Sequence, residues 1–305
     1  MKHLMPIFPA ALIVFIFACA PSPEKTVSSG RQQIAVGIEP ARYLTERIGG
    51  DRVEVFVLLR AGQNPHSYEI TPAQMKTLSA CSAYLSMGMP FEQALLPRLQ
   101  KAVAKIKIFP LDSGIEKTAA PEDYDESGEE HHAESGEHKK HEGELDPHIW
   151  LSPANLKIIS QNIYQALAVL QPERTAYFDS SFSALQTDIS QTDSLMRQEL
   201  APYKGMRFYV YHPAFGYFAR DYGLMQMAVE TGGKSPAPKE LAGLIQQARR
   251  DSVKVIFVQP QFDPSAAQKI ADAIGGRVAP LDGLEYDVLA NLHKIAEEIT
   301  RGGGK

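Results

Sequence analysis

The stretch PERTAYFDSSFSALQTDISQTDSLMRQEL (residues 172–200) lies just past the middle of the chain and has the pattern of one long helix. Pro172 suits the first turn of a helix, and no glycine or proline interrupts the residues that follow. Apolar residues recur at helical spacing and mark a single face: Phe178, Phe182, Leu185 and Ile189. A helix of this length rises about 40 Å. It predicts a stiff connection between two parts of the molecule.

The sequence before this helix and the sequence after it both alternate short β-branched runs with longer helical segments. Before it we expect strands at 34–38, 53–59, 83–87 and 106–109. After it we expect strands at 207–211, 225–229, 253–258 and 277–281. Strands that alternate with helices are typical of parallel sheets. The prediction is an α/β fold of two lobes, each a four-stranded parallel sheet flanked by helices, joined by the long rigid linker helix, with a cleft between the lobes.

The chain has 305 residues, which exceeds the usual size of one domain. The domain boundaries follow from the alternation of expected strands and helices. The expected segments are a lipoprotein signal peptide at 1–18, a flexible tether at 19–32, an N-terminal lobe at 33–171, a linker helix at 172–201 and a C-terminal lobe at 202–305.

The first residues, MKHLMPIFPAALIVFIFACA, have the pattern of an export signal. Lys2 precedes an apolar run that is too short for a permanent membrane span. The run ends at Ala18 and Cys19, the pattern of a bacterial lipoprotein signal in which the cysteine becomes the lipidated first residue. The alternative is an uncleaved membrane anchor. In both cases we expect a protein of the cell envelope, anchored at its N-terminus and facing the periplasm or the extracellular side.

The remaining bulk features narrow the classes of function. Cys81 is the only other cysteine, and we expect it to be a small buried core residue and not a disulfide partner or metal ligand. The net charge is −5 and the sequence has no basic patch, which argues against nucleic acid as a partner.

Residues 120–145 form a segment rich in acidic residues and histidine. Positions 122–144 hold ten Asp or Glu, two Lys and four histidines: His131, His132, His138 and His141. Such a composition cannot bury enough apolar surface to order itself, so we expect a disordered loop within the N-terminal lobe.

Three other histidines, His66, His148 and His212, each lie next to a proline and follow an expected strand. They should emerge at the carboxyl ends of parallel strands, which is the edge where open α/β sheets bind ligands. Asp282 follows the last expected strand in the same way. Three imidazoles and a carboxylate suit Zn²⁺ and also accept Mn²⁺ or Fe²⁺. The sequence therefore predicts a metal in the cleft with two ligands from each lobe: His66 and His148, then His212 and Asp282.

Other polar residues near these strand ends are weaker candidates. Asp287 should already lie in the last helix, and Glu69 and Glu230 are less well placed as ligands. Asp146 is better placed as a hydrogen-bond partner that fixes the tautomer of a histidine. We expect His293, inside the last helix, to be a surface or satellite histidine without a role in the site.

Several motifs resemble the zinc- and manganese-binding substrate-binding proteins of bacterial ABC importers, the cluster A-I metal receptors, with the high-affinity zinc-uptake type nearest. These motifs are LLRAGQNPHSYEITPAQ, LDPHIWLSPAN, VYHPAFGYFARDYGL, ETGGKSPAPKEL and VIFVQPQFD, and the resemblance runs from about Ile34 to Ile299. It implies that His66, His148 and His212 bind the metal. It also implies that Asp282, another carboxylate or water is the fourth ligand, and that an ABC permease and its ATPase are partners.

The resemblance also bears on the choice of metal. A histidine at the position of His212 is usual in the zinc receptors of this family, whereas glutamate is usual in the manganese receptors. Many of the zinc receptors carry a His- and acid-rich loop where this chain has residues 120–145, which implies a weak secondary metal collector. A solvated insertion with incidental metal affinity is the alternative reading of the loop.

The expected function is a monomeric, extracytoplasmic receptor without enzymatic activity that captures Zn²⁺ and delivers it to an ABC importer. One alternative is an Mn²⁺ or Fe²⁺ receptor, or a metal-dependent adhesin, of the same fold. A second alternative is a zinc hydrolase. The absence of an HExxH motif and of a nucleophile elbow argues against the hydrolase.

Overall fold

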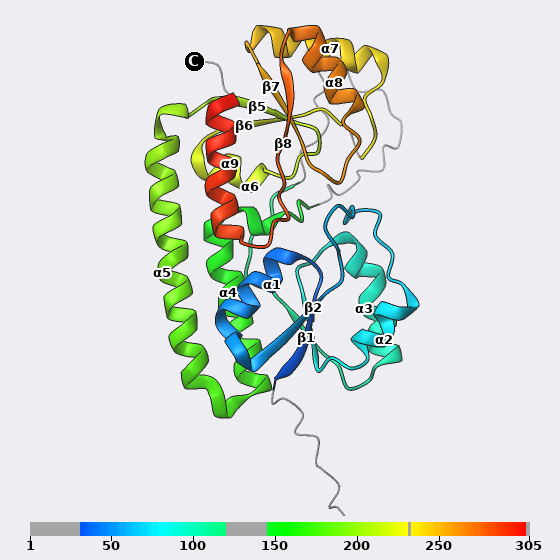
Figure 1. The fold of residues 1–305 in the computed structure, drawn as a ribbon, viewed down its shortest axis with the longest axis vertical. Coiled ribbons are helices and arrows are strands. Elements are labelled where there is room, and N and C mark those ends of the chain that lie inside the picture. The colour runs from blue at the N-terminus through cyan, green and yellow to red at the C-terminus, as the bar shows by residue number, and fades with distance from the viewer. Residues whose placement is uncertain (1–30, 120–144, 231–232, 303–305) are drawn as a thin grey trace, which may run out of the picture. The chain divides into compact units, whose positions relative to one another are not determined.

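The computed structural model describes residues 31–119, 145–230 and 233–302, and from Arg31 onward the chain belongs to one unit (Figure 1). The expected signal peptide, the lipidated Cys19 and nearly all of the tether lie outside the described residues. The same is true of the expected loop ligands, His131, His132, His138 and His141. These expectations therefore stay predictions.

The first sheet has four parallel strands in the order β2-β1-β3-β4. Its strands are β1 (Gln32–Val36), β2 (Val53–Val57), β3 (Ala83–Ser86) and β4 (Lys107–Pro110). The helices of this half of the chain are α1 (Glu39–Gly49), α2 (Pro72–Leu78), α3 (Pro90–Ala102) and α4 (Pro153–Leu170). Short 3-10 turns cover Gly50–Arg52 and Ile149–Leu151. Local signals start the helices: the hydroxyl of Thr71 accepts a hydrogen bond from Gln74 N ahead of α2, and Ser152 does the same for Asn155 N ahead of α4.

The second sheet repeats this order as β6-β5-β7-β8, again all parallel. Its strands are β5 (Arg207–Val210), β6 (Met225–Ala228), β7 (Val255–Val258) and β8 (Arg277–Pro280). Its helices are α6 (Gly216–Tyr222), α7 (Pro238–Arg250), α8 (Ser265–Ile274) and α9 (Val288–Gly302). The predicted fold class, two four-stranded parallel sheets flanked by helices, is confirmed.

The long helix between the two halves is α5 (Thr175–Leu200), with 3-10 turns at Pro172–Arg174 and Ala201–Tyr203 on either side. It packs against α1 and α4 of the first half and against α6 and α9 of the second (Figure 1). Its buried residues follow the helical spacing that the sequence predicted: Phe178, Leu185, Ile189, Thr192, Met196 and Leu200. No helix in the described parts of the chain is both long enough and apolar enough to cross a membrane.

The largest hydrophobic core is continuous through both halves of the described chain. Successive strand residues point to opposite faces of a sheet, and β5 shows this clearly. Phe208 and Val210 belong to the core that α5 and α9 share with the first sheet. Tyr209, on the other face, belongs to a smaller core beneath α7 and α8. Cys81 is buried in the larger core, as expected.

Basic residues occupy the last turns of helices α6, α7 and α9: Arg220, Arg249, Arg250 and Arg301. A cation near a helix C-terminus is favourable because it complements the helix dipole.

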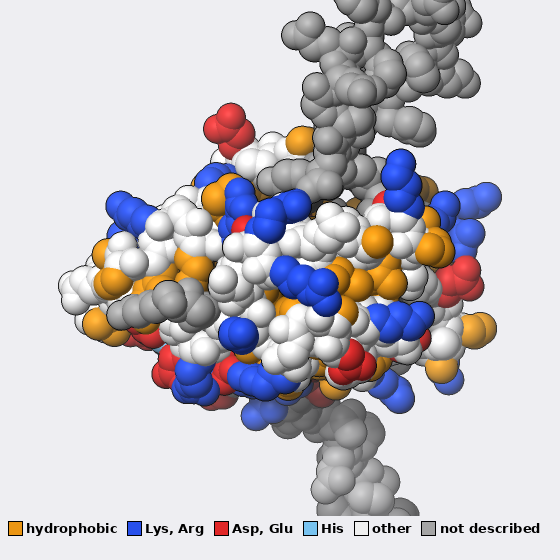
Figure 2. All heavy atoms as spheres, turned by 90° about the horizontal axis from the view of Figure 1, so that it is seen from above, with side chains coloured by type: hydrophobic (Ala, Val, Ile, Leu, Met, Phe, Trp, Pro, Cys, Tyr) orange, Lys and Arg blue, Asp and Glu red, His pale blue; other side chains and the backbone are white. Residues whose placement is uncertain are grey.

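Figure 2 views the end of the molecule that carries α7 and α8, where Lys and Arg side chains are spread among uncharged and apolar atoms, with few Asp or Glu. Positive charge thus gathers on this face although the net charge of the chain is −5.

Candidate metal centre

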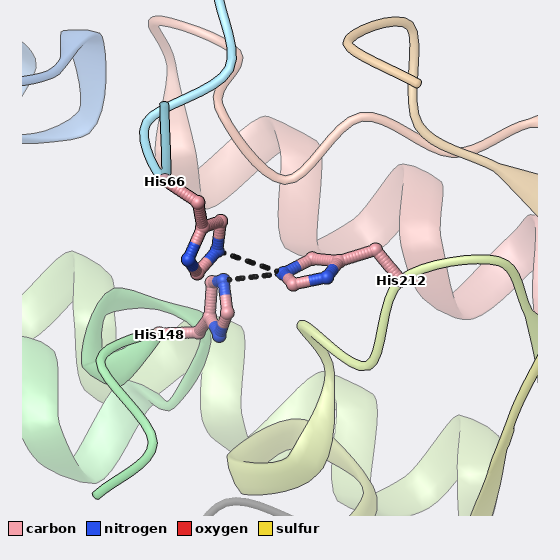
Figure 3. Close-up of side chains that lie close together, drawn as sticks. All are labelled: His66, His148 and His212. Atoms are coloured by element: carbon pink, nitrogen blue, oxygen red, sulfur yellow. Dashed lines mark hydrogen bonds between the residues drawn. The ribbon is translucent and has the colours of Figure 1, made fainter. Parts of the chain in front are cut away.

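Three histidines from separate segments come together where the two halves of the described chain meet (Figure 3). His66 lies on the loop between β2 and α2, His148 precedes the 3-10 turn before α4, and His212 follows β5 directly. Their candidate ligand nitrogens all lie within 4.8 Å of one another. The Nε2 atom of His212 is 3.0 Å from that of His66 and 3.1 Å from that of His148. The sequence predicted this group of three.

The same local structure, an Asx turn, orients two of the three histidines. The triplets Asn64-Pro65-His66 and Asp146-Pro147-His148 each place an Asx residue two positions before the histidine. In the first triplet the backbone N–H of His66 donates to Asn64 Oδ1 at 2.8 Å, and in the second that of His148 donates to Asp146 Oδ1 at 2.9 Å. The Asx turn fixes the backbone at the histidine, and the proline between them restricts its own φ.

His212 is oriented differently, by hydrogen bonds to its backbone and by an aromatic ring that stacks on its imidazole. Its N–H donates to Gln259 Oε1 at 3.2 Å, and Gln259 Nε2 donates to the His212 carbonyl at 2.6 Å. Phe262 stacks on the imidazole with ring centroids 4.7 Å apart. Both partners follow β7, the strand next to β5, so the neighbouring strand end holds this histidine in place.

Two buried carboxylates orient the imidazoles from behind. Asp146 Oδ1 lies 2.7 Å from His148 Nδ1, and Glu230 Oε1 lies 2.5 Å from His212 Nδ1. Both acidic residues are at most 5% exposed. An ionised carboxylate only accepts hydrogen bonds, so each Nδ1 carries the proton and each Nε2 offers its lone pair to the centre.

The role expected of Asp146 is thus present in the geometry. Glu230 was considered from the sequence only as a poor ligand candidate, and the structure places it instead behind the ring of His212. A signal for it existed in the strand pairing, because β5 and β6 align Val210 with Ala228. Continuing this register by two residues brings positions 212 and 230 side by side.

Burial and the neighbouring histidines favour the neutral form of two of these imidazoles, those of His66 and His212. Burial, followed by the proximity of His212 and His148, lowers the pKa of His66 to about 3. Burial also lowers the pKa of His212, an effect that its hydrogen bond to Glu230 partly offsets. Neutral imidazole is the form that binds metals.

The short distances between the Nε2 atoms favour a bound cation at this position. With protons fixed on Nδ1 of His148 and His212, their Nε2 lone pairs point at each other across 3.1 Å and cannot form an ordinary hydrogen bond. Nitrogen ligands at 2.0–2.1 Å in a tetrahedral zinc site lie roughly 3.3 Å apart. The observed separations are close to this value, so the three rings need little adjustment to share one ion.

The fourth predicted ligand, Asp282, is not part of the group that the three histidines form in the described chain. Its Oδ1 accepts hydrogen bonds from Gln261 Nε2 at 3.1 Å and from Leu284 N at 2.9 Å. Asp287 instead accepts from Ala290 N at the start of α9. The structure therefore brings three of the four predicted ligands together.

The remaining weak candidates also stay outside this group. Glu69 is exposed on the loop that carries His66, and His293 is half-buried in α9.

The segment that carries His148 is held by the second half of the chain, although it precedes α5. Trp150 Nε1 donates to the carbonyl of Gly283 at 2.7 Å, and the hydroxyl of Ser152 bonds to the carboxylate of Asp221. The expected division of ligands, two from each lobe, stays a prediction. The segment that carries His148 thus contacts the second half of the chain, and His66 lies on an exposed loop of the first half.

Comparisons with known proteins agree with this geometry. The family model described as zinc-uptake complex component A, periplasmic, matches residues 34–300. Zinc-binding lipoprotein AdcA of Streptococcus pneumoniae (strain ATCC BAA-255 / R6) is 25% identical over 305 residues, covering 99% of this chain. The alignment covers 58% of that lipoprotein, so this chain spans little more than half of its length.

Two solved structures are similar over most of the chain. A crystal structure of ZnuA has a TM-score of 0.81 and 34% identity, covering 90% of this chain and 100% of that one. A zinc-bound ZnuA mutant that lacks residues 138–173 of its own sequence has a TM-score of 0.80 and 33% identity, covering 90% and 99%.

Proposed function

The chain belongs to the family of periplasmic zinc-uptake components A, and we propose that it captures Zn²⁺ outside the cytoplasm and delivers it to an ABC importer. The observation that carries this proposal is the convergence of three imidazoles, with the Nε2 atom of His212 3.0 Å from that of His66 and 3.1 Å from that of His148. Zn²⁺ is the cargo of this site and completes it, because a divalent ion is attracted to all three lone pairs at once.

The charge balance of the site also favours a divalent cation. The carboxylates of Asp146 and Glu230 are buried directly behind two of the imidazoles. Two buried negative charges are costly when no positive charge lies near them. An ion of charge +2 bound to the imidazoles offsets the charges of these two carboxylates.

The donor set favours zinc over manganese. Three imidazole nitrogens with one further ligand match the tetrahedral preference of Zn²⁺, whereas Mn²⁺ prefers six oxygen-rich ligands and binds imidazole more weakly. An Mn²⁺ or Fe²⁺ receptor of the same fold would share the converging imidazoles and the buried carboxylates behind them. It would differ in which of these ions it binds most tightly. Relative affinities for the three ions therefore separate these readings.

For the fourth ligand we retain Asp282 as the candidate, with water as the alternative. It lies just beyond β8, at the carboxyl edge where the histidines gather. Binding would require its carboxylate to exchange the hydrogen bonds from Gln261 and Leu284 for the metal. Asp282→Ala should weaken zinc binding less than any single histidine substitution, because water can take the vacated position.

The same geometry argues against a hydrolase. A metal-bound water needs a nearby general base with a free lone pair. The two buried carboxylates beside the site both bind histidine Nδ1 atoms, and this leaves them directed away from the ion. A receptor that only binds and releases the ion needs no such base.

The remaining parts of the proposal concern cellular context. We propose that Cys19 carries lipid that holds the protein in the cell envelope, facing the periplasm or the extracellular side. The partners would be an ABC permease and its ATPase, and the receptor would act as a monomer. The segment 120–145, with His131, His132, His138 and His141, would bind further ions weakly.

The test is competitive zinc titration of residues 26–305 with a chromophoric chelator, for the wild type and for His66→Ala and His212→Ala. His293→Ala, a substitution on α9 away from the site, is the matched control. We expect one tight ion in the wild type and the control, and its loss in both site variants. Equal tight binding by all four proteins would refute the proposed site.

A further inference from the structure

The hydroxyl of Tyr217 joins the two chain segments that border residues 120–144. Thr118 N donates to this hydroxyl at 3.2 Å, and the hydroxyl donates to the carbonyl of Asp146 at 2.9 Å. The two segments also pair with each other, because Asp146 N donates to the carbonyl of Thr118 at 2.9 Å and Ala119 bridges Leu145 in antiparallel fashion. One side chain of α6 therefore fixes the backbone of both paired segments.

Asp146 carries this restraint to the metal centre. Its carbonyl accepts from Tyr217, while its Oδ1 accepts from both the backbone N–H and the Nδ1–H of His148. A shift of the Asp146 backbone would move the carboxylate that sets the tautomer and direction of the His148 ring. The path from Tyr217 to the ligand contains only this one residue.

Gly216, next to Tyr217, controls the same carboxylate from a second direction. A Cβ atom at position 216 would lie 2.8 Å from Asp146 Oδ2. That separation is shorter than a van der Waals contact, so any side chain larger than hydrogen would push the carboxylate away. The carboxylate could retreat only by changing its two hydrogen bonds to His148.

Tyr217 itself is rigidly held. It is fully buried within the large hydrophobic core, and the guanidinium of Arg220 lies 5.1 Å from the centre of its ring. It is five residues from His212 along the chain. The motif YHPAFGY thus supplies one candidate ligand, His212, and the support of another, His148.

We propose that Tyr217 and Gly216 are positioning residues for the metal ligand His148, acting through Asp146. The inference rests on the proposed function, in which the histidines bind zinc. It goes further by assigning to α6 the alignment of a ligand on a different segment, so that the two ligands His148 and His212 are set by one stretch of chain.

The first test compares Tyr217→Phe, which removes only the hydroxyl, with Tyr209→Phe. Tyr209 is equally buried, and its hydroxyl donates to Asp251 at 2.7 Å on the side of the second sheet that faces away from the shared core. Partners that orient a metal-bound histidine typically contribute 10–100-fold in affinity. Tyr217 acts one residue further away, so we expect a three- to tenfold weaker zinc affinity in Tyr217→Phe and no change in Tyr209→Phe.

The second readout follows the ring of His148 directly in metal-free protein labelled with ¹⁵N-histidine. A Nδ1–H held by a buried carboxylate exchanges slowly with water, and the His148→Gln variant assigns its resonance. We expect faster exchange in Tyr217→Phe and in Gly216→Ala, with the wild-type rate in Tyr209→Phe. A general loss of stability would affect both tyrosine variants and would not single out this proton.

The outcomes separate the two proposals. Unchanged affinity and unchanged proton exchange in Tyr217→Phe would overturn the positioning role, as would equal changes in the two tyrosine variants. If Tyr217→Phe does not fold, Gly216→Ala decides by the same two measurements. A wild type that binds no zinc tightly would refute the proposed function, while the proton exchange would still report on the positioning of His148.

Discussion

At the scale of single residues, the signals that mark His66 and His148 are local in sequence, whereas the partners that orient His212 are distant in sequence. His66 and His148 could be recognised because a proline and a preceding strand signal mark each of them within a few positions. Glu230 could not, because its contact with His212 depends on the pairing of β5 with β6 across eighteen positions of sequence. The position of Asp282 relative to the histidines depends likewise on the turn after β8, which the strand pattern alone does not specify.

The first prediction concerns the carboxylate behind His212. Glu230→Gln keeps an oxygen that can accept from Nδ1 but removes the buried charge that balances the ion. We expect zinc affinity to fall 10–100-fold, the range typical for partners of metal-bound histidines. The measurement is chelator competition, with Glu240→Gln as the control because Glu240 only accepts from Ala237 N at the start of α7. An affinity within twofold of the wild type would count against the charge-balance argument.

The second prediction concerns pH. Burial and the neighbouring histidines lower the pKa of His66 to about 3 in the folded protein, against about 6.5 for the unfolded chain. Between these values the unfolded chain binds the extra proton and the folded protein does not. The stability that is fully present above about pH 6.5 is therefore lost progressively as the pH falls through this window.

The lowered pKa of His212 acts in the same direction. Urea unfolding of the metal-free protein at pH 7, 6 and 5 should thus show a smaller decrease in the free energy of unfolding for His66→Ala than for the wild type. Carboxylates elsewhere titrate alike in both proteins and cancel in the comparison. Parallel curves for the two proteins would contradict the depressed pKa.

At the scale of elements, the long helix and the eight strands were recognisable because their signals are periodic and local. The pattern predicted a helix over 172–200, and the structure has α5 at Thr175–Leu200 with a 3-10 turn over its first three expected residues. The attachment of the His148 segment to the second half was not recognisable. It depends on Trp150 and Ser152 meeting partners more than sixty positions away.

The third prediction concerns the segment 120–144. Ala119 and Leu145 already pair in antiparallel fashion, so a two-residue Asn-Gly turn should close this gap without strain. We expect the shortened protein to keep one tight zinc ion at wild-type affinity and to lose any additional weakly bound ions. Equilibrium dialysis against graded zinc concentrations measures both. Loss of the tight ion upon replacement would show that the loop histidines, and not the three at the centre, hold it.

At the scale of the whole molecule, the two halves are joined by a shared core and not only by a linker. Helix α5 packs on elements of both halves, and the buried cluster around it runs from the first sheet to the second. A structure of this kind should unfold in one step and should change little in shape when an ion binds. The rigid linker predicted from the sequence is one part of this continuity.

The fourth prediction tests this continuity through Leu185, which is fully buried on α5. Leu185→Ala should lower the free energy of unfolding by about 2–5 kcal/mol, the usual cost of such a cavity. Circular dichroism reports both sheets and their helices, whereas fluorescence reports the single tryptophan, Trp150, at the junction. Coincident urea transitions from the two probes are expected for wild type and variant. Separate transitions would mean that the halves fold independently.

Zinc K-edge X-ray absorption of the singly loaded protein shows directly whether three imidazoles bind one zinc ion at this junction. We expect a four-coordinate ion with nitrogen or oxygen at about 2.0–2.1 Å and the outer-shell scattering of three imidazole rings. His66→Ala should reduce that outer-shell contribution to two rings. A six-coordinate oxygen shell, or imidazole scattering that is the same in both proteins, would contradict the assignment of His66, His148 and His212.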